Sequence, residues 1–137
     1  MTCSAGCITG GGKKQTGMDE FHSAESFFIN RNYAEAIDSY RKALKDSPES
    51  EWAPDAKFSI ASTLAFYDNP QRNFTQALQE FDEFLKQYPD HKRASEARNW
   101  RYVLKLVIDT RKENEHLKIS IEQLKRLDIR HEEQRRK

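Results

Sequence analysis

The chain repeats itself at an offset of 41 residues, and this repeat constrains the fold more than any other feature. Seven pairs of identical or similar residues share the offset: Tyr33 and Phe74, Ala36 and Ala77, Tyr40 and Phe81, Leu44 and Leu85, Pro48 and Pro89, Ala53 and Ala94, and Ala56 and Ala97. Seven matches at one offset are hard to obtain by chance. A period of this size is typical of stacked units, each of which buries its apolar face against the next.

Within each unit the apolar residues recur at spacings of three and four. In the first unit they are Tyr33, Ala36, Tyr40 and Leu44, followed by Pro48. Such spacing places the side chains on one face of a helix. The small alanine lets a neighbouring helix approach closely. The proline ends the helix because it lacks an N–H and clashes with the preceding turn. The pattern therefore predicts an all-α protein.

The units resemble the tetratricopeptide repeat, a helix–turn–helix module of about 34 residues. The first helices of the two units carry matching alanines, Ala24 and Ala61, which are 37 residues apart rather than 41. The second unit therefore has four extra residues between its helices, and residues 68–73 are the expected place because Asn-Pro favours a turn. Phe84 stands where the first unit has the small Ala43. The resemblance implies two helix pairs followed by a capping helix.

The joints between units carry a narrower resemblance. The segments SPESEWAPDAKF (47–58) and FLKQYPDHKRASEAR (84–98) resemble outer-membrane lipoproteins of the BamD/YfiO type. This resemblance implies a non-enzymatic adaptor that faces the periplasm and has protein partners in an envelope or outer-membrane assembly complex. Two alternatives are a lipoprotein accessory of an envelope sensor kinase and a soluble cytoplasmic repeat scaffold.

The N-terminal segment carries the candidate membrane anchor. Residues 1–17 contain all five glycines and no apolar period, so they are expected to form a flexible tether. Ser4-Ala5-Gly6-Cys7 resembles a bacterial lipobox, which implies lipidation of Cys7 and an outer-membrane location. Leucine is usual where Ser4 stands, and only six residues precede the cysteine, fewer than a signal peptide needs. The alternative is a pair of ordinary cysteines in a disordered tail.

A partner-binding groove is predicted from the repeat register. Proteins of this kind bind through the face lined by their first helices, and an aromatic groove would accept an apolar peptide or helix. The candidate lining residues are Phe21, Glu25, Phe28, Phe58, Ser62 and Phe66. The alternative is that the C-terminal helix or the N-terminal segment packs there.

The C-terminal part predicts one long helix. Neither glycine nor proline occurs from residue 92 to 137, about 65 Å if helical. We divide the chain into a repeat domain, 18–108, and an extended charged helix, 109–137. With Val103 at heptad position d, the seam residues are Val107, Asn114, Leu117, Ile121 and Leu124. This composition favours a parallel two-stranded coiled coil, and hence a homodimer or a partner helix. The alternatives are packing on the protein's own repeats and a frayed, solvated end.

Composition argues against several functions. The net charge is +1 although 33% of the residues are charged, so nucleic-acid binding is not expected. The four histidines are dispersed and form no metal-binding spacing. No motif of a nucleophilic or phosphate-binding site is complete. We therefore expect no catalytic residues, no metal and no cofactor.

Overall fold

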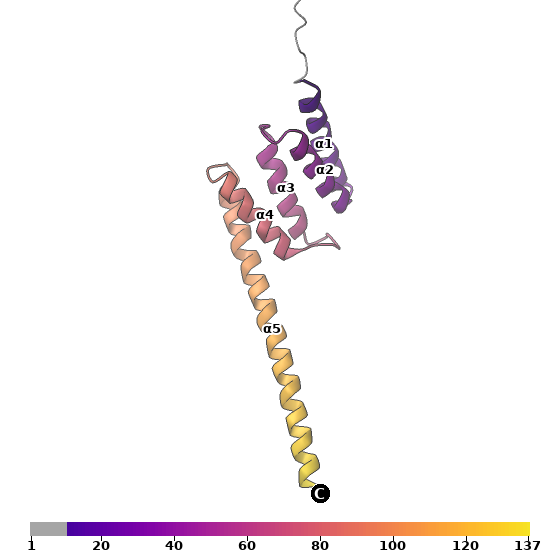
Figure 1. The fold of residues 1–137 in the computed structure, drawn as a ribbon, viewed down its shortest axis with the longest axis vertical. Helices are drawn as coiled ribbons and strands as arrows, with labels where there is room; N and C mark the ends of the chain where they lie inside the picture. The colour runs from indigo at the N-terminus through magenta and orange to yellow at the C-terminus, as the bar shows by residue number, and fades with distance from the viewer. Residues whose placement is uncertain (1–10) are drawn as a thin grey trace, which may run out of the picture.

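The computed structural model describes residues 11–137, which form five helices and contain no strand. The helices are α1 (Gly11–Ile29), α2 (Tyr33–Asp46), α3 (Ala53–Ala65), α4 (Phe74–Gln87) and α5 (Ala94–Arg135). Successive helices run in opposite directions, and each packs against the next one along the chain (Figure 1). Two helix pairs, α1–α2 and α3–α4, are thus followed by a capping helix. The predicted all-α, tetratricopeptide-like fold is confirmed.

The burial of matched residues shows that the two units are built alike. Ala36 and Ala77 are both fully buried, and so are Ala56 and Ala97. Both prolines of the repeat lie two residues beyond the last helical residue of their unit. The residue between helix and proline donates its N–H back to the last turn, from Ser47 in the first unit. The repeat in the sequence is therefore a repeat of packing.

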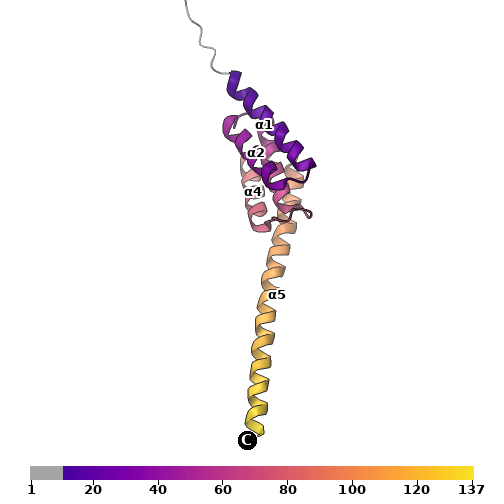
Figure 2. The same cartoon turned by 90° about the vertical axis from the view of Figure 1, so that its right-hand side faces the viewer.

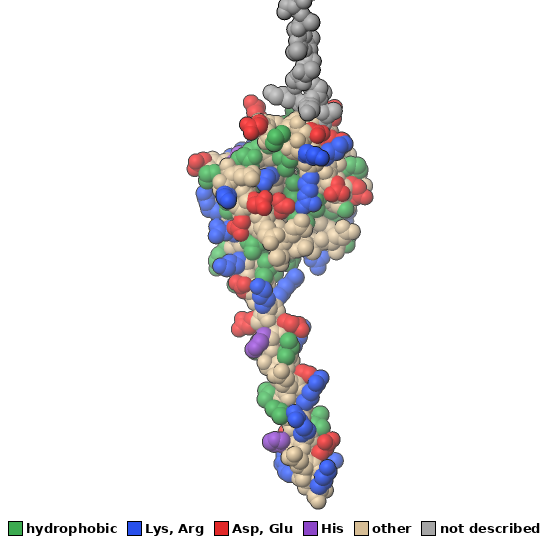
Figure 3. Space-filling view, viewed as in Figure 1, with side chains coloured by type: hydrophobic (Ala, Val, Ile, Leu, Met, Phe, Trp, Pro, Cys, Tyr) green, Lys and Arg blue, Asp and Glu red, His purple; other side chains and the backbone are tan. Residues whose placement is uncertain are grey.

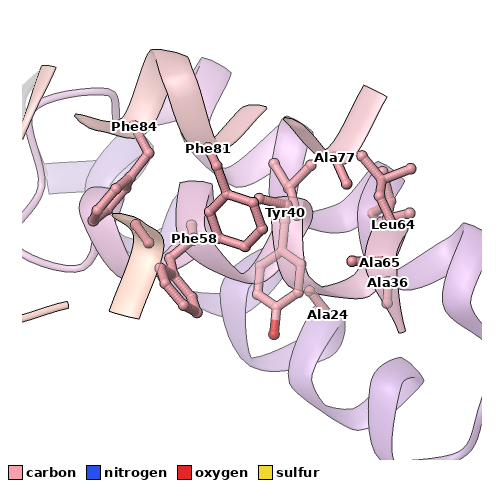
Figure 4. Packing of buried hydrophobic residues seen from close by; sticks show 14 of the residues in the cluster. Ala24, Ala36, Tyr40, Phe58, Leu64, Ala65, Ala77, Phe81 and Phe84 are labelled. Carbon is pink, nitrogen blue, oxygen red and sulfur yellow. The ribbon is translucent and has the colours of Figure 1, made fainter. Parts of the chain in front are cut away.

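The core of the second unit is more aromatic than that of the first. Phe81 and Phe84 of α4 lie edge-to-face against Phe58 of α3, with ring centroids 5.3 and 5.6 Å away (Figure 4). The guanidinium of Arg93 covers the Phe58 ring at 3.5 Å. Phe84 is fully buried at the position that Ala43 occupies in the first unit. The larger residue therefore fills space between α3 and α4.

The linker between α3 and α4 spans residues 66–73, whereas only residues 30–32 join α1 to α2. The extra residues thus lie where the repeat offsets predict them. Asn69 is buried in this linker, where its Nδ2 donates to the Thr63 carbonyl at 2.9 Å and its Oδ1 accepts from the Gln71 amide at 2.9 Å. The first bond holds the longer linker against the end of α3, and the second fixes the turn within the linker.

An ion pair joins the two linkers. Arg31 adopts a left-handed backbone conformation, with φ of 64°, at the end of α1. Its guanidinium lies 2.8 Å from the carboxylate of Asp68, which also accepts a hydrogen bond from the Tyr33 hydroxyl at 3.1 Å. The same end of both helix pairs is therefore cross-linked by side chains.

Helix α1 begins before the predicted boundary. Residues 11–17 were expected to belong to a flexible tether, yet α1 starts at Gly11. Gly17 is buried, and a Cβ at this position would lie 2.5 Å from Ser47 Oγ. Because glycine has no side chain, α1 can approach the end of α2 closely at this position. The packed part of α1 therefore includes Gly17. The rest of the predicted tether, residues 1–10, lies outside the described residues.

Candidate interaction surfaces

The residues of the predicted groove differ in how deeply they are buried. Phe58 was expected to line it, but this side chain is fully buried in the core between α3 and α4. That prediction is wrong for Phe58, because the aromatic side chains of α4 and Arg93 enclose its ring. Ser62 is half-buried, and its hydroxyl donates to the Phe58 carbonyl at 2.9 Å.

The aromatic residues of α1 pack mainly against other aromatic residues of the protein. The Phe21 ring lies 5.6 Å from Tyr40 and 5.2 Å from Trp52, between centroids. Phe28 lies 5.2 Å from Phe66, which follows the end of α3. These half-buried rings join α1 to α2 and α3. Phe21, Phe28 and Phe66 therefore contribute to packing within the body, and their part in a partner-binding groove stays a prediction.

What α1 leaves exposed is a mixed surface. Met18, His22, Glu25 and Ile29 are exposed and, by their spacing of three and four, share one face of the helix. The His22 imidazole and the Glu25 carboxylate lie 3.1 Å apart. Binding of a partner across this face stays a prediction.

Helix α5 has two distinct faces where it covers the repeats. Ala97 and Leu104 are buried toward α4. On the same side, Arg101 pairs with Asp82 at 2.9 Å, and the Arg111 guanidinium lies 4.6 Å above the Phe74 ring. Val103 and Leu106, by contrast, are exposed on another side of the helix. Large apolar residues therefore remain uncovered within the repeat domain itself.

Beyond Ile108, α5 leaves the rest of the protein, except that the Arg111 guanidinium still covers the Phe74 ring. We call residues 109–137 the arm and residues 11–108 the body. The arm projects from the body as a single helix (Figures 1 and 2). Every arm residue except Ser120 is exposed. This excludes the arrangement in which the tail packs back on its own repeats, and with it the idea that the arm fills the predicted groove.

The predicted seam residues lie along the exposed helix. Leu117, Ile121 and Leu124 are exposed apolar residues, and Asn114 is exposed between them and the half-buried Val107. Hydrophobic side chains alternate with charged ones along the arm (Figure 3). Leu127, which lies outside the predicted seam, joins Ile121 and Leu124 in lining a shallow open hollow. Its position three residues after Leu124 is the signal that could have revealed it.

Three side chains of the body have pKa values above their usual ones because of their structural contacts. Burial raises the pKa of Tyr40 above its usual value, and burial together with the hydrogen bond to Asp68 raises that of Tyr33. The hydrogen bond from Lys42 to Glu20 raises the pKa of the lysine and ties α2 to α1. Each of these shifts arises from burial or a hydrogen bond within the body.

The described part of the chain has no cluster of metal-binding side chains and no buried polar side-chain atom without a partner. No group of three or more His, Cys, Asp or Glu residues there could hold a metal ion. No buried side-chain nitrogen or oxygen there lacks a hydrogen-bond partner. From Gly11 onward, no helix combines the length and the apolar character that crossing a membrane requires.

The comparisons with known proteins bear on the whole repeat region. A family model named YfiO and described as outer membrane lipoprotein matches residues 13–128, which cover the body and most of the arm. No curated protein and no solved structure matches significantly. Cys7 lies outside both the matched and the described residues. On the strength of the family match, this chain belongs to the YfiO family of outer membrane lipoproteins.

Proposed function

We propose that this protein is a non-enzymatic adaptor that a lipid on Cys7 anchors to the outer membrane, where it faces the periplasm. Its task is to join protein partners in envelope or outer-membrane protein assembly. The family match supports the outer-membrane setting. The repeat architecture supports an interaction role, because stacked helix pairs present extended binding surfaces.

The observation that carries the adaptor role is the contrast between body and arm. The body has one buried cluster of apolar side chains that joins all five helices, although Val103 and Leu106 stay exposed. The arm leaves Leu117, Ile121 and Leu124 exposed on a charged helix. An apolar strip with a polar rim is what a helix offers to another helix or to a groove.

The proposed anchor rests on the sequence Ser4-Ala5-Gly6-Cys7 and on the family match. A single acyl chain holds a protein only marginally at a membrane, so stable anchoring requires several chains at that cysteine. An anchor at Cys7 would join the N-terminal end of α1, opposite the end of the body from which the arm leaves (Figure 1). The arm would then project away from the point of attachment.

Intact-mass analysis and detergent partitioning of the protein from its native host, expressed from its own gene, test the anchor. We expect a lipid-modified chain that begins at Cys7 and partitions into detergent. Cys7→Ser should abolish both properties, whereas Cys3→Ser should leave the mature chain unchanged. An unmodified chain in the soluble fraction would overturn the lipoprotein proposal and favour the cytoplasmic scaffold.

Co-purification in detergent tests the adaptor role. The full chain and a chain lacking residues 109–137 are compared at equal expression. We expect the full chain to retain envelope proteins that the truncated chain loses. Recovery of an outer-membrane assembly complex would agree with the proposal, and recovery of a sensor kinase would replace it with the second alternative. Equal recovery by both chains would place binding on the body and contradict the role of the arm.

A further inference from the structure

We infer that the exposed seam of α5 pairs with the same helix of a second copy of this chain, as a parallel two-stranded coiled coil. The inference names a second copy of this chain as an occupant of the apolar strip on which the adaptor proposal rests, and it does not depend on lipidation. The exposed faces, the residue types at each heptad position and the charges beside them carry it.

The seam is continuous from the body into the arm. Val103 is exposed beside the body, and Leu117, Ile121 and Leu124 are exposed in the arm. Between them, Val107, Thr110 and Asn114 complete the spacing of three and four. Toward the body, Ala97 and Leu104 occupy another side of α5 and are buried against α4. A second helix can therefore lie along the seam without displacing α4.

The residue types match a two-stranded coil. Val107 and Ile121, at position a, are β-branched, and Leu117 and Leu124 occupy position d. This combination favours two parallel strands rather than three or four. Asn114 falls at position a between them, where asparagine fixes register and strand number at some cost in stability. In a parallel pair, the Asn114 amides of the two copies meet and bond to each other.

The flanking charges select the orientation. Position e holds Arg111, Lys118 and Lys125, all of them basic. An antiparallel pair would set these e positions against one another, and like charges repel there. A parallel pair instead sets Glu113, at position g, beside Lys118 of the second copy. The charges therefore favour the parallel arrangement over the antiparallel one.

The seam has a defined end. Asp128 and His131 occupy the next a and d positions, and a parallel pair would bring the two Asp128 carboxylates together. Glu122 and Arg126 pair within one helix at 3.3 Å and lie at positions b and f, away from the seam. The proposed coil therefore covers residues 103–124 and leaves the last residues of the arm unpaired.

Sedimentation equilibrium of the full chain over a range of concentrations tests the pairing. We expect a reversible dimer, and we expect Leu117→Lys to raise its dissociation constant by about tenfold or more, since each tenfold corresponds to only about 1.4 kcal/mol. Ile119→Lys is the matched control, because Ile119 is 52% exposed and Leu117 51%, but Ile119 lies at position f. Circular dichroism checks that both variants stay helical. A monomer at every concentration, or equal weakening by both variants, would overturn the inference.

Disulfide trapping tests the orientation. In a chain with Cys3→Ser and Cys7→Ser, Asn114→Cys should cross-link two copies rapidly under mild oxidation, because a parallel pair aligns these positions. Lys112→Cys, at outer position f, should cross-link slowly. As a second check, Glu113→Lys should weaken the dimer, and adding Lys118→Glu should restore it. Slow cross-linking at position 114, or no recovery in the double variant, would contradict the parallel arrangement.

Discussion

Two leucines of one helix show how differently the body and the arm treat the same residue type. Leu104, in the body, is 2% exposed, and Leu117, in the arm, is 51% exposed. Leu104 faces α4, whereas Leu117 lies on the part of α5 that projects beyond the other helices (Figure 1). Hydrophobicity alone therefore does not decide burial in this protein. Burial depends on whether the repeat supplies a neighbouring helix, and after α5 it supplies none.

The same difference predicts unequal stability along the chain. In the body, each helix is held by tertiary packing against its neighbours. Apart from Arg111, which covers the Phe74 ring, the arm has only its own backbone hydrogen bonds and exposed pairs such as Glu122 with Arg126. Exposed pairs of this kind contribute a few tenths of a kcal/mol each. A lone helix in water is marginally stable, so the arm is expected to fray unless a partner covers it.

Removing a large core side chain should have the largest effect. Phe81→Ala leaves a cavity between α3, α4 and α5, and should lower the free energy of unfolding by about 3–5 kcal/mol. Leu124→Ala in the arm should change it by no more than about 0.5 kcal/mol. Urea denaturation of dilute protein measures both values. Similar losses of unfolding free energy in the two variants would contradict the distinction between body and arm.

Enlarging the small buried residues of the repeat should have the next largest effect on stability. Ala36→Leu or Ala77→Leu overpacks a contact between helices and should cost about 1–3 kcal/mol. Ala34→Leu is the control, because Ala34 lies on the same helix as Ala36 but is exposed. Thermal unfolding measures the three variants. If both core variants kept the thermal stability of the unaltered chain, the repeat register would be wrong.

Removing the buried side-chain amide of Asn69 in the linker should destabilise the protein almost as much. Asn69→Ala removes the bonds to the Thr63 carbonyl and the Gln71 amide, leaves these groups short of partners, and should cost about 1–3 kcal/mol. Asn99→Ala alters an exposed asparagine of α5 and provides the comparison. Hydrogen exchange across residues 63–73 should also accelerate in the Asn69 variant. An unchanged exchange rate there would show that the linker does not need this anchor.

Deleting the arm should have a smaller effect on the body. A chain that ends at residue 108 loses the contact between Arg111 and Phe74, which corresponds to about 0.5–1 kcal/mol at an exposed site. Arg111→Ala in the full chain should show the same loss. Guanidinium denaturation followed by tryptophan fluorescence reports on the body alone, since both tryptophans lie there. An unfolded truncated chain would mean that the arm is part of the folded unit.

Alkaline pH should give the smallest and most specific effect. Burial raises the pKa of Tyr40 above the unfolded value of 10.0, so the folded chain holds this proton longer than the unfolded chain. Stability from this group is complete below pH 10.0 and falls as the pH rises toward the folded pKa. Tyr40→Phe should reduce the pH dependence of urea unfolding above that value, whereas Tyr102→Phe, at an exposed position, should not. An identical dependence in all three chains would refute this assignment.

The repeat architecture could be predicted from the sequence because packing between similar helices requires similar residues at regular intervals. The matched alanines and prolines located the helices and their ends, and the difference between two offsets located the longer linker. Burial of Phe58 was not predicted, because its enclosure depends on Phe84 and Arg93, which belong to other elements. Likewise, the helical start at Gly11 depends on a close contact between Gly17 and Ser47, and glycine-rich composition pointed the other way.

The candidate interaction surface was predicted only in part. The heptad pattern identified the seam, since apolar residues at spacings of three and four form a single strip along a helix. The pattern did not reveal whether the tail folds back on the body, because that depends on which side of α5 meets α4. The Arg31–Asp68 pair between linkers was also missed, because ion pairs across distant turns leave no periodic signal.

Hydrogen exchange of the full chain at low concentration separates the packed body from the unsupported arm. We expect amides of α2, α3, α4 and the body part of α5 to exchange at the rate of global unfolding. Amides beyond residue 112 should exchange orders of magnitude faster, and should become protected as the concentration rises and the arm pairs with a second copy. Uniform protection along α5 in dilute solution would refute this division, because the arm would then belong to the same cooperative unit as the body.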